Sequence, residues 1–129
     1  MNEDVKDYIG KWLVKAEHDL LNAQTVIEYN PLILDTACFH CQQAVEKYLK
    51  AFLVYKGVIV ERTHNLNFLL DVCSQHDNDF STIETKNLND FGVEIRYPDN
   101  FLSPSMEETK EYLQIALEIK NLECKKINL

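Results

Sequence analysis

Glycine and proline are scarce in this sequence, with three of each among 129 residues. Because domains built from many short strands need frequent turns, this scarcity favours long helices. No uninterrupted apolar stretch approaches the roughly 18 residues that cross a bilayer. The first four residues, Met1 to Asp4, are acidic where the start of a signal peptide would be basic. We therefore expect a helical protein of the cytoplasm that makes no contact with a membrane.

Basic residues are also in deficit. There are 21 acidic and 13 basic residues, and the resulting net charge of −8 opposes generic binding to duplex DNA. A local basic pocket can still hold a nucleotide. The apolar fraction of 46% is close to that of ordinary globular proteins, and the length suits one hydrophobic core. The sequence thus predicts one helical domain over residues 1–129.

The four cysteines do not form a pattern with chemistry of its own. Cys38 and Cys41 make a C-x-x-C, but it lies inside a strongly helical stretch with no preceding strand, unlike a redox motif. Cys73 and Cys124 are too scattered to supply the second pair of a zinc site. We interpret the cysteines as small apolar residues and expect neither a metal nor a cofactor.

Apolar residues recur at spacings of three and four along most of the chain, as in helices that bury one face. This periodicity predicts about five helices, from about Val5 to Ile27, Ala37 to Phe52, Leu66 to Cys73, Thr82 to Ile95 and Ser105 to Ile119. Short connections favour an all-α, up-and-down antiparallel bundle. The β-branched run 58–60 would have no partner strand, so we expect a loop there.

Several residues have the chemistry of helix ends. Asp35 and Thr63 are the predicted N-caps of the second and third helices, and Gly57 is the predicted C-terminal cap of the second. Ser105 and Glu108 have the spacing of a capping box, which places the start of the last helix.

The second predicted helix carries a polar face, formed by His40, Gln43, Glu46, Lys47 and Lys50. Gln43, Lys47 and Lys50 follow one another at i, i+4 and i+7, so they project together. The simpler interpretation is a solvated face with a Glu46–Lys50 ion pair, and the alternative is one wall of an anion-binding pocket. The chain contains no glycine-rich phosphate loop, zinc-protease motif or nucleophile elbow.

Two further residues lie where anions can bind. His64 stands at the start of the third predicted helix, where backbone N–H groups are free, although it can equally be a capping or packing residue. Arg96 precedes Tyr97 and Pro98 at a break between helices, where its guanidinium can hold a phosphate by two hydrogen bonds. The alternative for Arg96 is an ion pair with an acidic neighbour, namely Asp19, Glu94 or Asp99.

Four segments, taken in order, resemble the signature of the HEPN domain family. They are AEHDL at 16–20, FHCQQAVEKYLKAFL at 39–53, HNL at 64–66 and RYP at 96–98. Their order and spacing are similar to the family pattern from about Tyr8 to Leu122. The resemblance implies a helical bundle that dimerises and is often encoded beside a minimal nucleotidyltransferase, as a toxin–antitoxin or nucleotide-handling module.

The chain departs from the pattern of the ribonuclease members of that family. Those members use an arginine followed four to six residues later by a histidine, whereas residues 97–103 after Arg96 contain no histidine. The missing histidine would act as general acid or base on RNA, and the arginine would stabilise the charged phosphate. His64 or His40 can replace it only if the fold brings one of them close.

The resemblance and the polar residues together lead to our main prediction. It is a non-enzymatic HEPN-like protein that binds a nucleotide or polyphosphate through Arg96, Lys47, Gln43 and His64, and acts with a nucleotidyltransferase-type partner. Its many aromatic residues predict more apolar surface than one core absorbs, and hence a homodimer. Two alternatives stay open: a metal-independent ribonuclease toxin and a purely structural helical adaptor.

Overall fold

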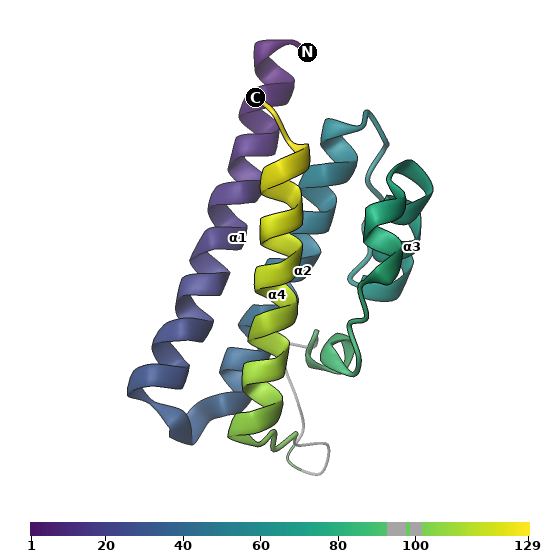
Figure 1. Cartoon of the computed structure of the whole chain (residues 1–129). Helices are drawn as coiled ribbons and strands as arrows, with labels where there is room; N and C mark the ends of the chain where they lie inside the picture. The colour runs from purple at the N-terminus through teal and green to yellow at the C-terminus, as the bar shows by residue number, and fades with distance from the viewer. Residues whose placement is uncertain (93–97, 99–101) are drawn as a thin grey trace.

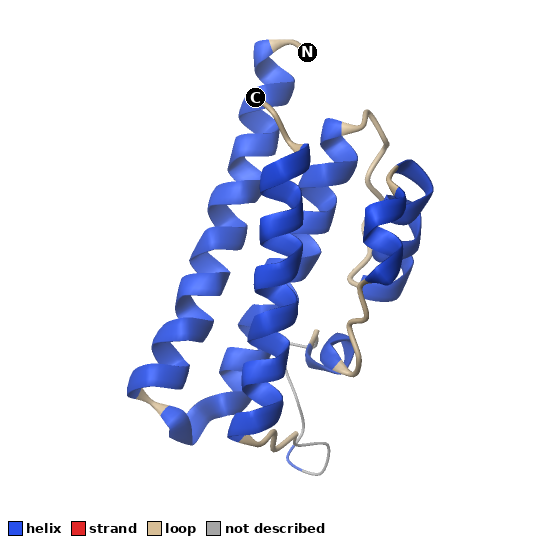
Figure 2. Ribbon diagram, viewed as in Figure 1, coloured by secondary structure: helices blue, strands red, loops and turns tan. Residues whose placement is uncertain are grey.

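The computed structural model describes residues 1–92, 98 and 102–129. Its α-helices are α1 (Glu3–Tyr29), α2 (Leu34–Tyr55), α3 (Leu66–His76) and α4 (Met106–Lys126). The described residues also include the short 3₁₀ turns η1 (Pro31–Ile33), η2 (Asn78–Thr82) and η3 (Leu88–Phe91). The described residues contain no strand (Figure 2), which confirms the all-α prediction and the loop at 58–60. None of the described helices is long and apolar enough to span a membrane.

The three long helices lie side by side, and α3 flanks α2 (Figure 1). The turn η1 reverses the chain, so α1 and α2 run antiparallel. Helix α2 is the centre of the bundle because it contacts α1, α3, α4 and η3. Both chain ends lie at the same end of the bundle in Figure 1.

The core forms around α2 because its apolar residues recur at helical spacing on more than one side. Leu49 and Phe52 are fully buried, and the ring centroids of Phe52 and Phe80 are 4.5 Å apart. Each fully buried side chain of this size contributes about 1.5–3 kcal/mol. Cys38, Cys41 and Cys73 are buried free thiols of this core, whereas Cys124 is exposed.

Two of the predicted helix ends are present. Ser105 and Glu108 form a capping box at the start of α4, in which each side chain accepts from the other's backbone N–H. Gly57, with a positive φ of 74°, ends α2, and its N–H donates to the carbonyl of Val54. Only glycine adopts this backbone conformation without strain, so the predicted cap has a physical basis.

The other two predicted caps are each wrong by two residues. Asp35 lies in the first turn of α2 rather than before it, because η1 leads into α2 directly and Ile33 takes the cap position. Helix α3 is capped by Asn65, whose side chain accepts from the N–H of Phe68 at 3.1 Å. Thr63 instead accepts from the backbone N–H of Asn65 at 3.2 Å.

The fourth predicted helix, from about Thr82 to Ile95, is also wrong over its described part. The chain there forms η2 and η3, with Ile83 extended between them and Lys86 at a positive φ of 52°. Neither conformation continues an α-helix. Leu88 and Phe91 are both buried, and their separation of three residues suits a 3₁₀ turn as well as an α-helix. Residues 93–95 lie outside the described part of the chain.

Candidate functional site

The polar face of α2 packs against α1 and against the loop that precedes α3. The Glu46–Lys50 ion pair is present, with Nζ and Oε2 3.0 Å apart, but Glu46 is only 4% and Lys50 only 5% exposed. The interpretation of this face as simply solvated is therefore wrong. We call the following group the α1–α2 seam: Trp12, Asp19, His40, Gln42, Gln43, Glu46, Lys47, Lys50 and His64.

The first cluster of the seam is centred on Asp19, a buried carboxylate of α1. His40 Nδ1 lies 2.8 Å from Asp19 Oδ1, and Lys47 donates to the other oxygen, Oδ2. Burial by itself would raise the pKa of Asp19, but these two hydrogen bonds outweigh it and the pKa lies below its usual value. Asp19 is therefore an ionised acceptor that holds both side chains of α2 in place.

The second cluster is centred on Glu46. Besides Lys50, this carboxylate binds His64, whose Nδ1 lies 2.9 Å from Oε1. The two partners differ in exposure, since 74% of the His64 side chain is exposed and 7% of that of Lys50. The Lys50 ammonium also lies 5.6 Å from the ring centroid of Trp12, a favourable cation–π contact.

Gln42 connects this cluster to its neighbours on both sides. Its Oε1 accepts from Gln43 Nε2 at 2.7 Å, and its Nε2 donates to the backbone carbonyl of His64 at 3.1 Å. Gly92 also packs against Gln42, because a Cβ on Gly92 would lie 3.0 Å from Gln42 Nε2. The loop before α3 and the chain after η3 thus meet at one buried amide.

The predicted binding residues divide between these clusters. Gln43 and His64 are linked through Gln42, whereas Lys47 belongs to the Asp19 cluster. Arg96 lies outside the described residues. Our sequence prediction missed the roles of Asp19 and Glu46 as buried acceptors and that of Gln42 as the link.

The seam contains two imidazoles, His40 and His64, and Nδ1 of each is hydrogen-bonded to a buried carboxylate. Because Asp19 and Glu46 accept hydrogen bonds as carboxylates, Nδ1 of His40 and of His64 carries the hydrogen. Nε2 of each ring is then left for a ligand, a water molecule or a proton. Two lysines balance two carboxylates, so the seam has no net charge while both imidazoles are neutral. Such a site can orient hydrogen-bond donors around a phosphate or transfer a proton.

One family model matches most of the chain, and one solved structure is similar in fold. The family model described as the HEPN domain matches residues 9–127. A crystal structure described as that of an archaeal HEPN homologue is similar in fold, with a TM-score of 0.66, 22% identity, and coverage of 93% of this chain and 98% of that one. At this identity the likeness shows the fold alone. A search of curated proteins finds no match.

Proposed function

This chain belongs to the HEPN domain family, and we propose that it binds a nucleotide or polyphosphate at the α1–α2 seam. The observation that carries the proposal is the pair of buried carboxylates, Asp19 and Glu46, each of which fixes one lysine and one imidazole. Donors that are already held in place lose little conformational entropy when a ligand arrives, which favours its binding.

The accessible donors of the seam suit an anionic ligand. Lys47 is half-buried with 22% of its side chain exposed, and Gln43 beside it is also half-buried. Arg96 stays in the proposal on the strength of the sequence resemblance. It follows Gly92, which packs against Gln42, by four residues, and its guanidinium would add the positive charge that the balanced seam lacks.

Titration calorimetry with ATP and with tripolyphosphate tests this function. We expect both to bind, and we expect Lys47→Met and Arg96→Ala each to weaken binding by about 1.5–3 kcal/mol, the range for a charged hydrogen bond. Lys110→Met, at an exposed position of α4, is the matched control and should bind as the parent does. If neither anion binds the parent protein, the proposal is wrong and the structural-adaptor alternative gains support.

We further propose that the protein is a homodimer and that it acts with a nucleotidyltransferase-type partner in a toxin–antitoxin or nucleotide-handling module. Large apolar side chains are exposed along α1 and η1, with Leu21 62%, Tyr29 75% and Leu32 93% exposed. Such side chains favour burial in a symmetric interface. Light scattering should give twice the chain mass of 15.1 kDa. A 15.1 kDa particle at micromolar concentration would refute the dimer.

A second candidate function, metal-independent cleavage of RNA, is favoured by the two oriented imidazoles. One Nε2 would take the proton of a ribose 2′-hydroxyl, and the other would protonate the leaving 5′-oxygen, which gives a 2′,3′-cyclic phosphate. The assay is incubation with single-stranded RNA in excess EDTA. Cleavage that is lost in His40→Gln and in His64→Gln supports this candidate, and intact RNA after incubation with the parent protein excludes it.

A further inference from the structure

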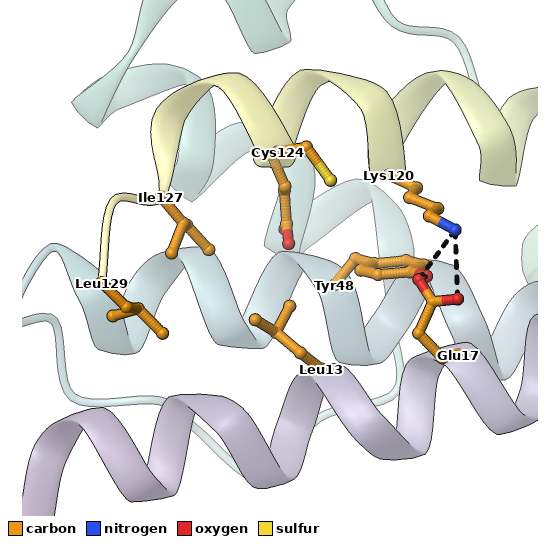
Figure 3. A pocket seen from close by; sticks show the side chains of 8 residues that line it. Leu13, Glu17, Tyr48, Lys120, Cys124, Ile127 and Leu129 are labelled. Atoms are coloured by element: carbon orange, nitrogen blue, oxygen red, sulfur yellow. Dashed lines mark hydrogen bonds and ion pairs between the residues drawn. The ribbon is translucent and has the colours of Figure 1, made fainter.

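A separate cavity of about 290 Å³ lies between α1, α2, α4 and the last residues of the chain (Figure 3). Its walls are mainly apolar, formed by Leu13, the ring of Tyr48, Ile127 and Leu129. Cavities that bind drug-sized molecules start at about this volume, so this one suits a small ring rather than an extended ligand.

Glu123 of α4 lines this cavity, although it is an acidic residue among mainly apolar ones. Only 2% of its surface is exposed, and neither carboxyl oxygen has a hydrogen-bond partner among the described residues. Burial of a carboxyl group without a partner destabilises a fold by about 1–3 kcal/mol. Both carboxyl oxygens are covered by protein atoms, so the side chain must turn toward the cavity before it can serve as a donor and acceptor there.

The charged groups around the cavity are already matched. Lys120 Nζ lies 3.0 Å from the carboxylate of Glu17, and the Tyr48 hydroxyl donates to that carboxylate at 2.5 Å. These contacts occupy Glu17, as the dashed lines of Figure 3 show for the ion pair with Lys120. Lys120 and the Tyr48 hydroxyl are therefore both bound to Glu17 and are not available to pair with Glu123.

The proton of Glu123 determines what chemistry can satisfy it. Burial raises the pKa of Glu123 well above its ordinary value, and the nearby Cys124 thiol acts in the same direction. A neutral carboxyl group presents one donor, O–H, beside one acceptor, C=O. Its complement is a planar group with an adjacent acceptor and donor, as in a cis-amide or a lactam.

We propose that this cavity binds a small, neutral, mostly apolar ring with a cis-amide edge, which pairs with the carboxyl group of Glu123. The ring would lie against Leu13, Ile127 and Leu129, and the amide edge would exchange two hydrogen bonds with Glu123. A cationic amine is the less favourable occupant, because Glu123 would have to ionise in an apolar cavity and the amine would lose its own hydration. This site is distinct from the α1–α2 seam and does not depend on the function proposed for it.

The probe is ε-caprolactam, a seven-membered ring with a cis-amide edge. Cyclohexanol, a neutral ring with a single hydroxyl, and cyclohexylamine, a cationic ring, are the comparisons. Each is titrated into the full chain labelled with ¹⁵N, and amide shifts are followed by two-dimensional NMR. We expect the lactam to shift the amides of Leu13, Cys124 and Ile127 and to bind about tenfold more tightly than cyclohexanol, the gain from one net hydrogen bond. No shift at these amides would overturn the proposal, as would stronger binding of cyclohexylamine.

Two variants test whether Glu123 binds the lactam as a neutral donor and acceptor or as a negatively charged carboxylate. Glu123→Gln keeps a donor beside an acceptor at nearly the same size, so it should bind the lactam as the parent does. Glu123→Met keeps the volume without the polar edge and should bind the lactam about tenfold more weakly. For the parent, lactam affinity should fall as the pH rises through the raised pKa of Glu123, whereas the Gln variant should show no such dependence. Loss of lactam binding in Glu123→Gln would show that the carboxyl group acts in another way.

Discussion

The α1–α2 seam and the Glu123 cavity both bury carboxyl groups, but the two regions differ in the partners that these groups have. In the seam, Asp19 and Glu46 each have two partners, one lysine and one histidine. In the cavity, Glu123 has none among the described residues. The pKa of Asp19 is lowered although burial alone would raise it, whereas the pKa of Glu123 is raised because burial is unopposed.

The comparison shows that burial alone does not fix the state of a carboxyl group. Desolvation acts in both regions, and the presence or absence of cationic donors decides whether the group keeps or loses its proton. The carboxylates of the seam therefore hold positively charged lysine donors in fixed orientations. The cavity instead contains one neutral carboxyl group, which has one donor and one acceptor. Four predictions test this contrast, from the largest expected effect to the smallest.

Removing the charge of Glu46 should destabilise the fold most. In Glu46→Gln the Lys50 ammonium stays buried without an opposite charge, so the free energy of unfolding should fall by about 3 kcal/mol, near the lower end for broken buried pairs. Urea denaturation measures it. Glu118→Gln, at an exposed position of α4, is the control and should change stability by less than about 0.5 kcal/mol. An unchanged Glu46→Gln would mean that Lys50 reaches water.

Removing the polar group of Glu123 in the cavity should change stability in the opposite direction. Glu123→Met replaces an unpaired buried carboxyl group with an apolar side chain of similar length, so the free energy of unfolding should rise by about 1–3 kcal/mol. Thermal melting and urea denaturation both report the change. A destabilised Met variant would show that Glu123 has a partner in solution that the fold requires.

The pH dependence of stability should separate the two regions. Because the folded pKa of Asp19 is lowered, its contribution is present above its unfolded pKa and is lost as the pH falls through the folded value. For Glu123 the folded pKa is raised, so its contribution is complete below the unfolded pKa and is lost as the pH rises through the folded one.

Glu123→Gln should therefore flatten the decline in stability above about pH 4.5 and leave the loss at lower pH unchanged. Urea denaturation at a series of pH values measures both limbs. The contrast would fail if the Gln variant kept the full decline toward neutral pH.

The smallest effect concerns the thiols near each region. Burial raises the pKa of Cys38 to about 11 and also raises those of Cys41 and Cys73, whereas Cys124 is exposed beside the cavity. Since the thiolate is the reactive form, Ellman's reagent should titrate one thiol quickly in the folded protein and all four after unfolding. Cys124→Ser should remove the fast phase. Any fast thiol in this variant would indicate that the core opens readily.

The sequence could predict the long helices because their apolar residues recur over many turns. It failed between Thr82 and Phe91, where the same spacing of three residues serves a 3₁₀ turn and where a positive φ at Lys86 interrupts the chain. Such backbone conformations depend on how Leu88 and Phe91 reach the core, which local periodicity does not encode.

For the seam, the spacing of Gln43 and Lys47 could be recognised, but not the burial of Glu46 and Lys50. Which side of α2 meets α1 is a tertiary fact, and it turns an apparently solvated pair into a buried one. The sequence did contain a signal for the buried carboxyl group of the cavity, which our sequence prediction did not use. Glu123 continues the inward stripe of α4 four residues after Ile119, and an acidic residue at such a position indicates a polar group inside the core.

The three-residue turn η1 makes α1 and α2 a local hairpin, and this affects how the chain is made. Asp19 and Lys47 are 28 residues apart, whereas Glu17 and Lys120 are 103 apart. Loop closure favours the nearer pairing, so the hairpin should form first and α4 should dock last. On a ribosome that adds about 5–20 residues per second, the apolar face of α2 waits for α4 for roughly 4–14 s. Aggregation competes with folding most strongly during that interval of translation.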